Sequence, residues 1–395
     1  MDEILGFFSN SGAFSCKTSL NNSCSDIVVL TDSIIYNRAE LCSKYKIKNC
    51  CSDASMLAEL YNLKGESFVS ELRGDFSIVL YDRNKEEGFL FRDRLGTRPL
   101  LYSQVGDKIY FASEAKCLST YKEIALKPNL KRIIANLFFW FWADKSETYF
   151  ENVFNVMPGE YIKIRTGSIE RIKYWDIVHN KYIKLKVNEV QNELVKVMRM
   201  VCNDSQHKIA TLLSGGVDSS LVTSLASKNL DDFFALTVKY DDSEDNNDFE
   251  FAQKVAKQLV NVKHITNYIP PSFINLNNLD MLTYHLEECV WDRVYFSMYT
   301  NYKAAKNCGC DIVISGQGAD ESWLGYYHYY PLYKFTNKEQ FTTDNLLNYF
   351  MNRSIRERKN VTESAIEIAN GYLDKTIKNN IPFLKDNSWE CSNSI

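Results

Sequence analysis

The chain has 395 residues, which is enough for two or three domains that each bury a core of their own. Hydrophobic residues make up 45% and charged residues 24%, which are ordinary values for a globular protein. The net charge of -4, from 46 basic and 50 acidic residues, excludes a charge-driven partner such as nucleic acid or an anionic membrane surface. We therefore expect small-molecule partners, no nucleic acid and no membrane.

The amino-terminal residues and the cysteines indicate the compartment. The opening sequence MDEILGFFSN has neither a basic segment nor a long apolar core, so it is not a secretory signal. The most apolar stretch, residues 133–143, is about half as long as a bilayer crossing requires and is predicted to be a buried helix. The 11 cysteines include no CxxC pair, and the 5 histidines lack ligand spacing. We expect reduced thiols in a cytoplasmic protein, not a disulfide framework or a zinc site.

Short runs of β-forming residues dominate the first third of the chain. They are bounded by Gly, Asn and Asp, and one helix-like segment, residues 52–63, interrupts them. The predicted strands cover residues 26–30, 76–82, 88–92, 99–102 and 108–112. This pattern predicts an α+β layer arrangement with hairpins.

Two of these strand pairs contain a specific motif. Residues 72–102 read LRGDFSIVLYDRNKEEGFLFRDRLGTRPLLY, and residues 109–118 read IYFASEAKCL. They resemble the glutaminase domain of the asparagine synthetase family, in which an RDxxGxxPLYY turn is followed by an (F/V)ASExKAL strand. The resemblance implies an Ntn-hydrolase-like, class II glutamine amidotransferase-like α+β domain over residues 1–180.

The residues that carry glutaminase chemistry in that family are absent. Family members begin Met-Cys, and the exposed Cys is the nucleophile, whereas position 2 here is Asp2, which cannot form a thioester. The family strand NGEIYN supplies oxyanion donors but reads DSIIYN at residues 32–37, so Asp32 replaces a donor with an acceptor. The segment that normally carries an Arg for the glutamine carboxylate is shortened, around residues 15–25. We predict no glutaminase activity and a scaffold role for this domain.

The sequence also predicts the segment that connects this domain to the next. Residues 127–144 are predicted to form a helix with an aromatic face. Residues 149–164, YFENVFNVMPGEYIKI, resemble the family's bridge, where a Pro-Gly turn leads to a strand. The domain boundary is predicted between residues 178 and 186. Apolar residues at helical spacing then predict a helix over residues 187–204.

A strand, a tight glycine loop and a helix are predicted from residue 209 onward. β-forming residues 209–213 lead into SGGVDSS at residues 214–220, and an apolar helical period begins at Leu221. Two adjacent glycines let the main chain approach an anion, and the loop N–H groups converge with three serine hydroxyls. Asp218 would repel a bare anion, so a divalent cation between its carboxylate and a phosphate is required. The pattern predicts a magnesium–nucleotide site.

This loop is neither a Walker A loop nor a GxGxxG dinucleotide motif. SGGVDSS resembles the pyrophosphate loop of the ATP pyrophosphatases, which adenylate a substrate and release pyrophosphate. Downstream, predicted strands at residues 233–239 and 311–315 alternate with predicted helices at residues 248–259, 276–288 and 298–307. Alternation predicts a doubly wound parallel sheet with its ligands beyond the carboxyl ends of the strands. We therefore predict an ATP pyrophosphatase (PP-loop) domain over residues 181–395.

A second motif, ISGQGADESWLGY at residues 314–326, resembles the family's SGxGxDExFxGY loop. The resemblance implies that Asp218 and Asp320 hold Mg2+ across the triphosphate, where the ion neutralises the leaving pyrophosphate. It also implies that the strand end at residues 236–240, which includes Val238, lines the adenosine. The ATP- and pyrophosphate-binding residues implied in this way are Leu213, Ser214, Gly215, Gly216, Asp218, Ser219, Ser220, Val238, Ser315, Gly316 and Gly318.

Position 317 differs among relatives according to substrate: Glu in asparagine synthetases, Tyr in β-lactam synthetases and His in some lasso-peptide cyclases. Gln317 can orient an amine or a carboxylate but cannot act as a base. Arg293 lies in a segment that borders the acceptor substrate in relatives, and it is a candidate partner for a substrate carboxylate. Gln317 and Arg293 are therefore the predicted catalytic residues.

Two functional hypotheses remain open. In the first, MgATP activates a small-molecule or peptide carboxylate as an acyl-adenylate, and ammonia or an amine of the substrate attacks it, as in β-lactam synthetases and lasso-peptide cyclases. In the second, Gln317 and the short tail after residue 326 leave a nucleotide-binding homologue that is non-catalytic or partner-dependent. Relatives use a tail lysine, for which Lys334 and Lys338 are the nearest candidates. A homodimer or a biosynthetic partner protein is the expected assembly.

Overall fold

The computed structural model describes residues 4–9, 14–16, 22–24, 26–48, 52–139, 145–165, 168–177, 186–203, 207–240, 247–290, 292–323 and 325. These residues form two compact units, the first up to residue 177 and the second from residue 186 to residue 325. Each unit has its own hydrophobic core.

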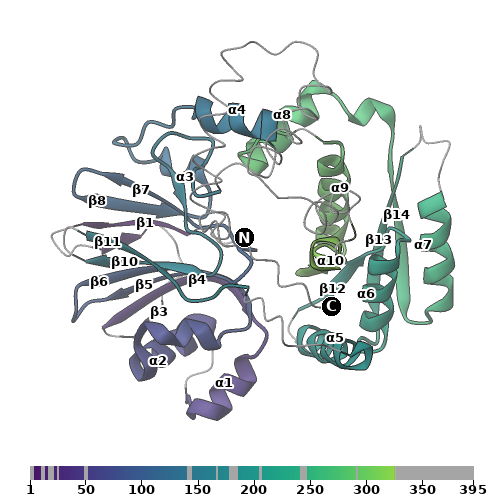
Figure 1. The fold of residues 1–395 in the computed structure, drawn as a ribbon, viewed down its shortest axis with the longest axis horizontal. Helices are drawn as coiled ribbons and strands as arrows, with labels where there is room; N and C mark the ends of the chain where they lie inside the picture. The colour runs from purple at the N-terminus through teal and green to yellow at the C-terminus, as the bar shows by residue number, and fades with distance from the viewer. Residues whose placement is uncertain are drawn as a thin grey trace, which may run out of the picture. The chain divides into compact units, whose positions relative to one another are not determined.

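The first unit contains two antiparallel sheets (Figure 1). The five-stranded sheet has the order β2 (Phe14–Cys16), β1 (Leu5–Ser9), β8 (Lys108–Ala112), β7 (Leu101–Val105) and β9 (Phe154–Asn155). The six-stranded sheet has the order β11 (Ser168–Lys173), β10 (Glu160–Arg165), β6 (Glu87–Arg92), β5 (Gly74–Asp82), β4 (Ile27–Ile35) and β3 (Asn22–Cys24). The antiparallel pairing confirms the hairpin arrangement expected from the sequence.

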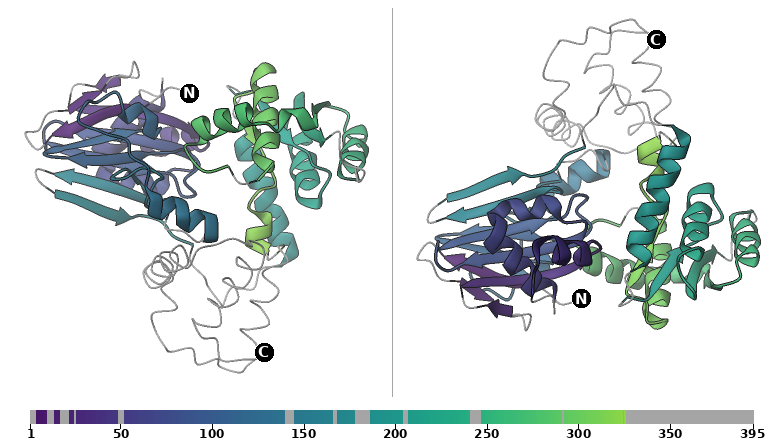
Figure 2. Two further views of the ribbon diagram at one scale, coloured as in Figure 1. Left: turned by 90° about the horizontal axis from the view of Figure 1, so that it is seen from above. Right: turned by 90° about the horizontal axis from the view of Figure 1, so that it is seen from below.

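Strand alternation builds a layered sandwich. Val28 and Leu30 of β4 face the five-stranded sheet and meet Phe111 of β8, whereas Ile27 and Val29 face the opposite side. On that side α2 (Asp53–Lys64) and the 3-10 segment η1 (Gly65–Glu71) complete the core, and α1 (Arg38–Tyr45) packs beside them (Figure 2). The short helix α3 (Ala115–Leu118) packs on the outer face of the five-stranded sheet. The unit is an antiparallel sandwich with helices outside it, as predicted.

Sequence reasoning missed several short elements of this unit, β1 and α1 among them. The strand β1 was not predicted, and it pairs with β8 in the register Leu5↔Ala112, more than a hundred residues away. The helix α1 was also missed, because only Leu41 is buried and its apolar period is weak. The predicted helix at residues 127–144 is α4 (Leu130–Phe139), and its expected continuation lies outside the described residues.

The second unit is built on a parallel sheet with the order β14 (Val262–Ile269), β13 (Phe233–Tyr240), β12 (Ile209–Leu212) and β15 (Ile312–Ile314). On one face α6 (Val217–Ser227) and α7 (Asn247–Gln258) cover the sheet, and on the other lies α9 (Val294–Asn307) (Figure 1). Ala235 packs with Ala252 of α7, and Leu236 packs with Ala305 of α9. The helices α5 (Val187–Cys202), α8 (Leu276–Leu286) and α10 (Ala319–Trp323) complete the unit. The predicted doubly wound parallel sheet is confirmed.

One missed strand and two shifted helix starts are the main differences from the predictions in this unit. The edge strand β14 was missed because its polar residues interrupt the apolar run. Helix α6 begins at Val217 rather than Leu221, because Gly216 serves as its N-cap and the first turn is polar. Helix α9 begins at Val294 rather than at residue 298. The earlier start of α6 is functionally important, since it places Asp218 in the first helical turn.

The expectation about thiols requires one correction. Among the cysteines in the described part, six form no disulfide, namely Cys16, Cys117, Cys202, Cys289, Cys308 and Cys310, but Cys42 is disulfide-bonded. The sequence pattern could not show this, because the pairing depends on which side chains the fold brings together. None of the described helices is long and apolar enough to cross a membrane.

Candidate functional site

The loop between β12 and α6 is shaped by two glycines with different tasks. Gly215 has φ +94°, and a Cβ there would lie 2.2 Å from the carbonyl oxygen of Asp248. Only glycine fits this position, because both its conformation and its contact with α7 exclude a side chain. Gly216 has no neighbour closer than Ser214 Oγ, 3.5 Å from where its Cβ would be, so its face of the loop is open. The loop is pinned to α7 on one side and open on the other.

The first turn of α6 is free to bind an anion. Gly216, its N-cap, provides no side-chain cap for the helix. The first N–H groups of a helix lack intrahelical partners and carry the positive end of the helix dipole. An uncapped first turn beside an open glycine is the arrangement that holds phosphate groups in other proteins.

The three predicted serines do not have equivalent positions. Ser219 is buried, its Oγ accepts the Ser214 N–H at 3.2 Å, and it donates to the Gly216 carbonyl at 3.1 Å. The Oγ of Ser220 is buried and has no hydrogen-bond partner among the described residues. Ser214 is exposed, with its Oγ 2.9 Å from Ser219 Oγ. The hydroxyl of Ser219 therefore shapes the loop from within, and Ser214 is the serine at its surface.

The second motif forms a loop that touches the first. It joins β15 to α10 and contains Ser315, Gly316 and Gln317. A Cβ on Gly316 would lie 2.9 Å from Cβ of Asp218 and 2.9 Å from the main-chain nitrogen of Ser219. Because β12 and β15 are parallel neighbours, their carboxyl ends lie at one edge of the sheet. The structure thus brings together the two motifs, which are about 100 residues apart in the sequence.

The contact at Gly316 supports a prediction about stability. Gly316→Ala is expected to lower the free energy of unfolding by about 1–3 kcal/mol and to weaken ATP binding, because one loop must move to admit the methyl group. The matched variant Gly216→Ala has a negative φ and open space. Its free energy of unfolding should lie within about 0.5 kcal/mol of that of the wild type, and it should still bind ATP more weakly. Chemical unfolding and calorimetric titration with ATP measure both effects; equal stability of the two variants would contradict the contact.

Two carboxylates without cationic partners lie in these loops. Asp218 occupies the first turn of α6, and Asp320 occupies the first turn of α10. Within the described ranges, neither side chain forms an ion pair or a hydrogen bond. The described residues contain no group of three or more His, Cys, Asp or Glu side chains that could hold a metal. Two carboxylate groups fit Mg2+ as part of its oxygen shell, with phosphate oxygens and water supplying the rest.

Gln317 is exposed, and its side chain is directed toward the helix that follows, α10. Its main-chain N–H donates to Ser315 Oγ at 3.3 Å, and its Nε2 donates to Glu321 Oε1 at 3.2 Å. Gly318, with φ +95°, turns the chain into α10. The side chain of Gln317 therefore lies beside the contact of the two loops without bonding to the nucleotide loop.

The strand end at β13 contributes an aromatic ring, Tyr240, that holds a cation from the start of α9. Leu236 of β13 pairs with the last residue of β12, and β13 then continues to Tyr240. Val238 therefore lies on the part of β13 that extends past the point where β12 becomes the nucleotide loop. The guanidinium of the exposed Arg293 lies 5.1 Å from the centre of the Tyr240 ring. The hydroxyl of Tyr240 donates to the Arg293 carbonyl at 3.0 Å and also bonds Ser297. Arg293 has no acidic partner among the described residues, so it is available to a carboxylate. Tyr240 belongs to the strand end, residues 236–240, that the resemblance assigns to the adenosine, but its contact with Arg293 was not predicted.

In the first unit, the structure shows the surroundings of Asp32, the residue that departs from the family strand NGEIYN. Buried Asp93 accepts the N–H groups of Thr97 and Arg98, each at 3.0 Å, and so fixes the RDxxGxxP turn. That turn directs the Arg98 guanidinium at the Asp32 carboxylate, 3.4 Å away. Ser33 donates to Asp53 at 2.8 Å. A charged acceptor, bound by an arginine, therefore occupies the position that the resemblance assigns to an oxyanion donor. Asp2 lies outside the described residues.

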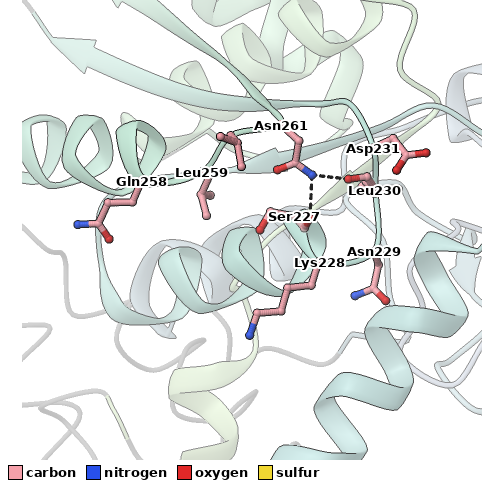
Figure 3. Close-up of a pocket in the computed structure, with 9 residues that line it drawn as sticks. Ser227, Lys228, Asn229, Leu230, Asp231, Gln258, Leu259 and Asn261 are labelled. Carbon is pink, nitrogen blue, oxygen red and sulfur yellow. Dashed lines mark hydrogen bonds between the residues drawn. The ribbon is translucent and has the colours of Figure 1, made fainter.

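A separate pocket lies at the opposite edge of the second sheet (Figure 3). It has a volume of about 410 Å³ and lies between the carboxyl ends of α6 and α7. Asn261 closes it by donating to the Ser227 carbonyl at 2.7 Å and to that of Leu230. Because helix carboxyl ends present carbonyl groups, this edge is unsuited to phosphate. The pocket is distinct from the nucleotide loop.

The two folds and the paired loops define a class of protein, in which an amidotransferase-type sandwich is joined to an adenine-nucleotide-binding parallel sheet. Comparisons agree with this class: residues 15–175 match the glutamine amidotransferase domain, and residues 189–385 match asparagine synthase. The chain belongs to the asparagine synthetase family, which uses ATP.

Several curated relatives are similar to most of the chain. Glutamine-hydrolysing asparagine synthetase 2 of Bacillus subtilis is 28% identical over 76% of this chain and 43% of its own length. Glutamine-hydrolysing asparagine synthetase B of Escherichia coli is 25% identical over 88% of this chain and 61% of its own length. Amidase chry2 of Gibberella zeae is 27% identical over 73% of this chain and 45% of its own length. The chain spans about half the length of these relatives.

Proposed function

We propose that the protein is an ATP-dependent carbon–nitrogen ligase that activates a carboxylate as its acyl-adenylate for attack by an amine. The observation that carries the proposal is the contact between Gly316 and Asp218. It brings an open, uncapped helix start, Gln317 and two carboxylates that have no cationic partner among the described residues to one edge of the sheet. An anion-binding loop beside carboxylates without cations suits a magnesium–triphosphate, because each negative group then has a counter-charge.

The described residues support distinct tasks in such a reaction. The first turn of α6 binds phosphate oxygens, and Asp218 and Asp320 would hold Mg2+, which when bound neutralises charge on the leaving pyrophosphate. Val238 lies at the strand end suited to the adenosine. Arg293, fixed on Tyr240, holds a substrate carboxylate. Gln317 orients the acceptor through its amide and does not remove a proton.

Exchange of labelled pyrophosphate into ATP tests this proposal over a panel of small and peptide carboxylates. Carboxylate-dependent exchange supports adenylation, and its absence from every member of the panel, with ATP still bound, supports the second hypothesis, a non-catalytic or partner-dependent homologue. The hydrogen bond that directs Gln317 toward Glu321 favours this second hypothesis. Product masses then separate amidation by ammonia from lactam or macrolactam formation, since cyclisation removes one water from a single molecule. We also propose that the protein assembles as a homodimer or with a biosynthetic partner protein.

The purified protein is expected to release no glutamate from glutamine. The reason is chemical: Asp2 cannot form a thioester, and Asp32 is a carboxylate paired with Arg98 where an oxyanion donor is needed. An enzyme-coupled glutamate assay measures the outcome. Asp2→Cys alone should stay inactive, because Asp32 still presents an acceptor. Glutamate release by the wild type that disappears in Asp2→Ala would contradict this prediction.

A further inference from the structure

The peptide bond that enters the nucleotide loop is held in an unusual way. Leu213 follows β12, and its N–H continues the ladder by donating to the Leu236 carbonyl at 2.9 Å. Its own carbonyl accepts the hydroxyl of Thr237 at 2.5 Å. In the described part of the chain no main-chain N–H donates to this carbonyl. A side chain therefore supplies the hydrogen bond at the point where the strand becomes the loop.

The other side of the same peptide group is also held by a hydroxyl. The Ser214 N–H donates to Ser219 Oγ at 3.2 Å. Because a peptide group is planar, the Leu213 carbonyl and the Ser214 N–H turn together. Thr237 on β13 and Ser219 on α6 thus fix one rigid plane from two elements. The orientation of that plane sets the direction in which Ser214, Gly215 and Gly216 leave the sheet.

Thr237 is itself oriented by a third element. It is 2% exposed, and its Oγ1 lies 2.8 Å from Nε2 of His264 on β14. A threonine hydroxyl has one proton, which is given to the Leu213 carbonyl, so Nε2 of His264 must be the donor in the second bond. Burial lowers the pKa of His264, which favours a neutral ring, and the hydrogen bond to Thr237 places the ring proton on Nε2. A relay of hydrogen bonds therefore runs across three neighbouring strands, from β14 through β13 to the end of β12.

We infer that Thr237, oriented by His264, is a positioning residue for the nucleotide loop. It acts through the Leu213 carbonyl and does not touch the ligand. The inference rests on the proposed function, because the loop is taken to bind ATP phosphates. The competing explanation is that the hydroxyl only satisfies a buried carbonyl, and the two explanations differ in what happens to ATP affinity when fold stability is matched.

A set of threonine variants separates these explanations. Thr237→Val removes the hydroxyl at nearly constant shape, and Thr237→Ser retains it. Thr223→Val is the matched control, because Thr223 is 0% exposed and its hydroxyl donates to Thr211 Oγ1 at 3.1 Å, away from the loop peptide. Both valine variants leave a buried polar atom without its partner and should lose stability by similar amounts, about 1–3 kcal/mol.

Calorimetric titration with ATP at fixed magnesium is the primary measurement, and chemical unfolding reports stability. Thr237→Val should bind ATP about tenfold more weakly, whereas Thr237→Ser and Thr223→Val should bind within about threefold of the wild type. His264→Gln, which keeps an N–H donor, should also stay within about threefold, and His264→Leu should reproduce part of the loss. Where exchange activity is found, the KM for ATP should rise in Thr237→Val while the KM for the carboxylate stays unchanged.

Equal ATP affinity of Thr237→Val and Thr223→Val would overturn the inference and leave the proposed function intact. A wild type that binds no ATP would overturn both. If Thr237→Val fails to fold, Thr237→Ser and the two His264 variants are compared instead. Unchanged ATP affinity in His264→Leu, together with weak ATP binding by Thr237→Ser, would contradict the relay.

Discussion

Asp218→Ala is expected to abolish the magnesium dependence of ATP binding and to reduce affinity by about 10- to 100-fold, or about 1.4–2.7 kcal/mol. The carboxylate lies in the first turn of α6 and has no cationic partner among the described residues, so its natural counter-charge is a bound divalent cation. Without the carboxylate, the helix start and the loop N–H groups still attract phosphate, which is why some affinity should remain.

Calorimetry with and without a chelator measures this effect directly. The wild type should lose ATP affinity when magnesium is removed, and Asp218→Ala should be insensitive to the chelator. The control is Asp231→Ala, an exposed carboxylate at the opposite edge of the sheet, which should behave like the wild type. Circular dichroism establishes that the variants are folded. Unchanged affinity and unchanged magnesium dependence in Asp218→Ala would remove the loop from the nucleotide site.

Gln317→Glu is expected to separate nucleotide binding from amide formation. ATP affinity should stay within about threefold, under ~0.7 kcal/mol, because Gln317 is exposed and bonds to Glu321 rather than to the nucleotide loop. Any amide-forming turnover should change by about tenfold or more, since a carboxylate replaces a neutral amide beside the acceptor.

The matched control is Glu321→Gln, which removes the partner of Gln317 but leaves the amide in place. Its turnover should remain within about threefold of the wild type if Gln317 acts through its own side chain. Loss of ATP binding in Gln317→Glu would instead assign Gln317 to the nucleotide site. Equal turnover in Gln317→Glu and the wild type would mean that this residue touches neither substrate.

Local sequence patterns were sufficient for most of the fold. The alternation of Ile27, Val28, Val29 and Leu30 between two cores is a period of two that can be read directly from the sequence. In the second unit, apolar strands alternating with helical periods predicted the parallel sheet. The elements that were missed depend on distant partners: β1 is stabilised by β8, and β14 contains polar residues because it is an edge strand.

The sequence by itself determined the fold class and the family, and it located the two motifs, because glycine, serine and aspartate at fixed spacing have few other uses. Only the tertiary structure decided which position and contacts each of those residues has. It placed Gly316 against Asp218, turned Ser219 inward and left Ser214 at the surface. It also assigned a part to Thr237 and His264, two residues in no motif, because a hydrogen bond across strands depends on register. Register is set by packing over the whole sheet, and no local pattern contains it.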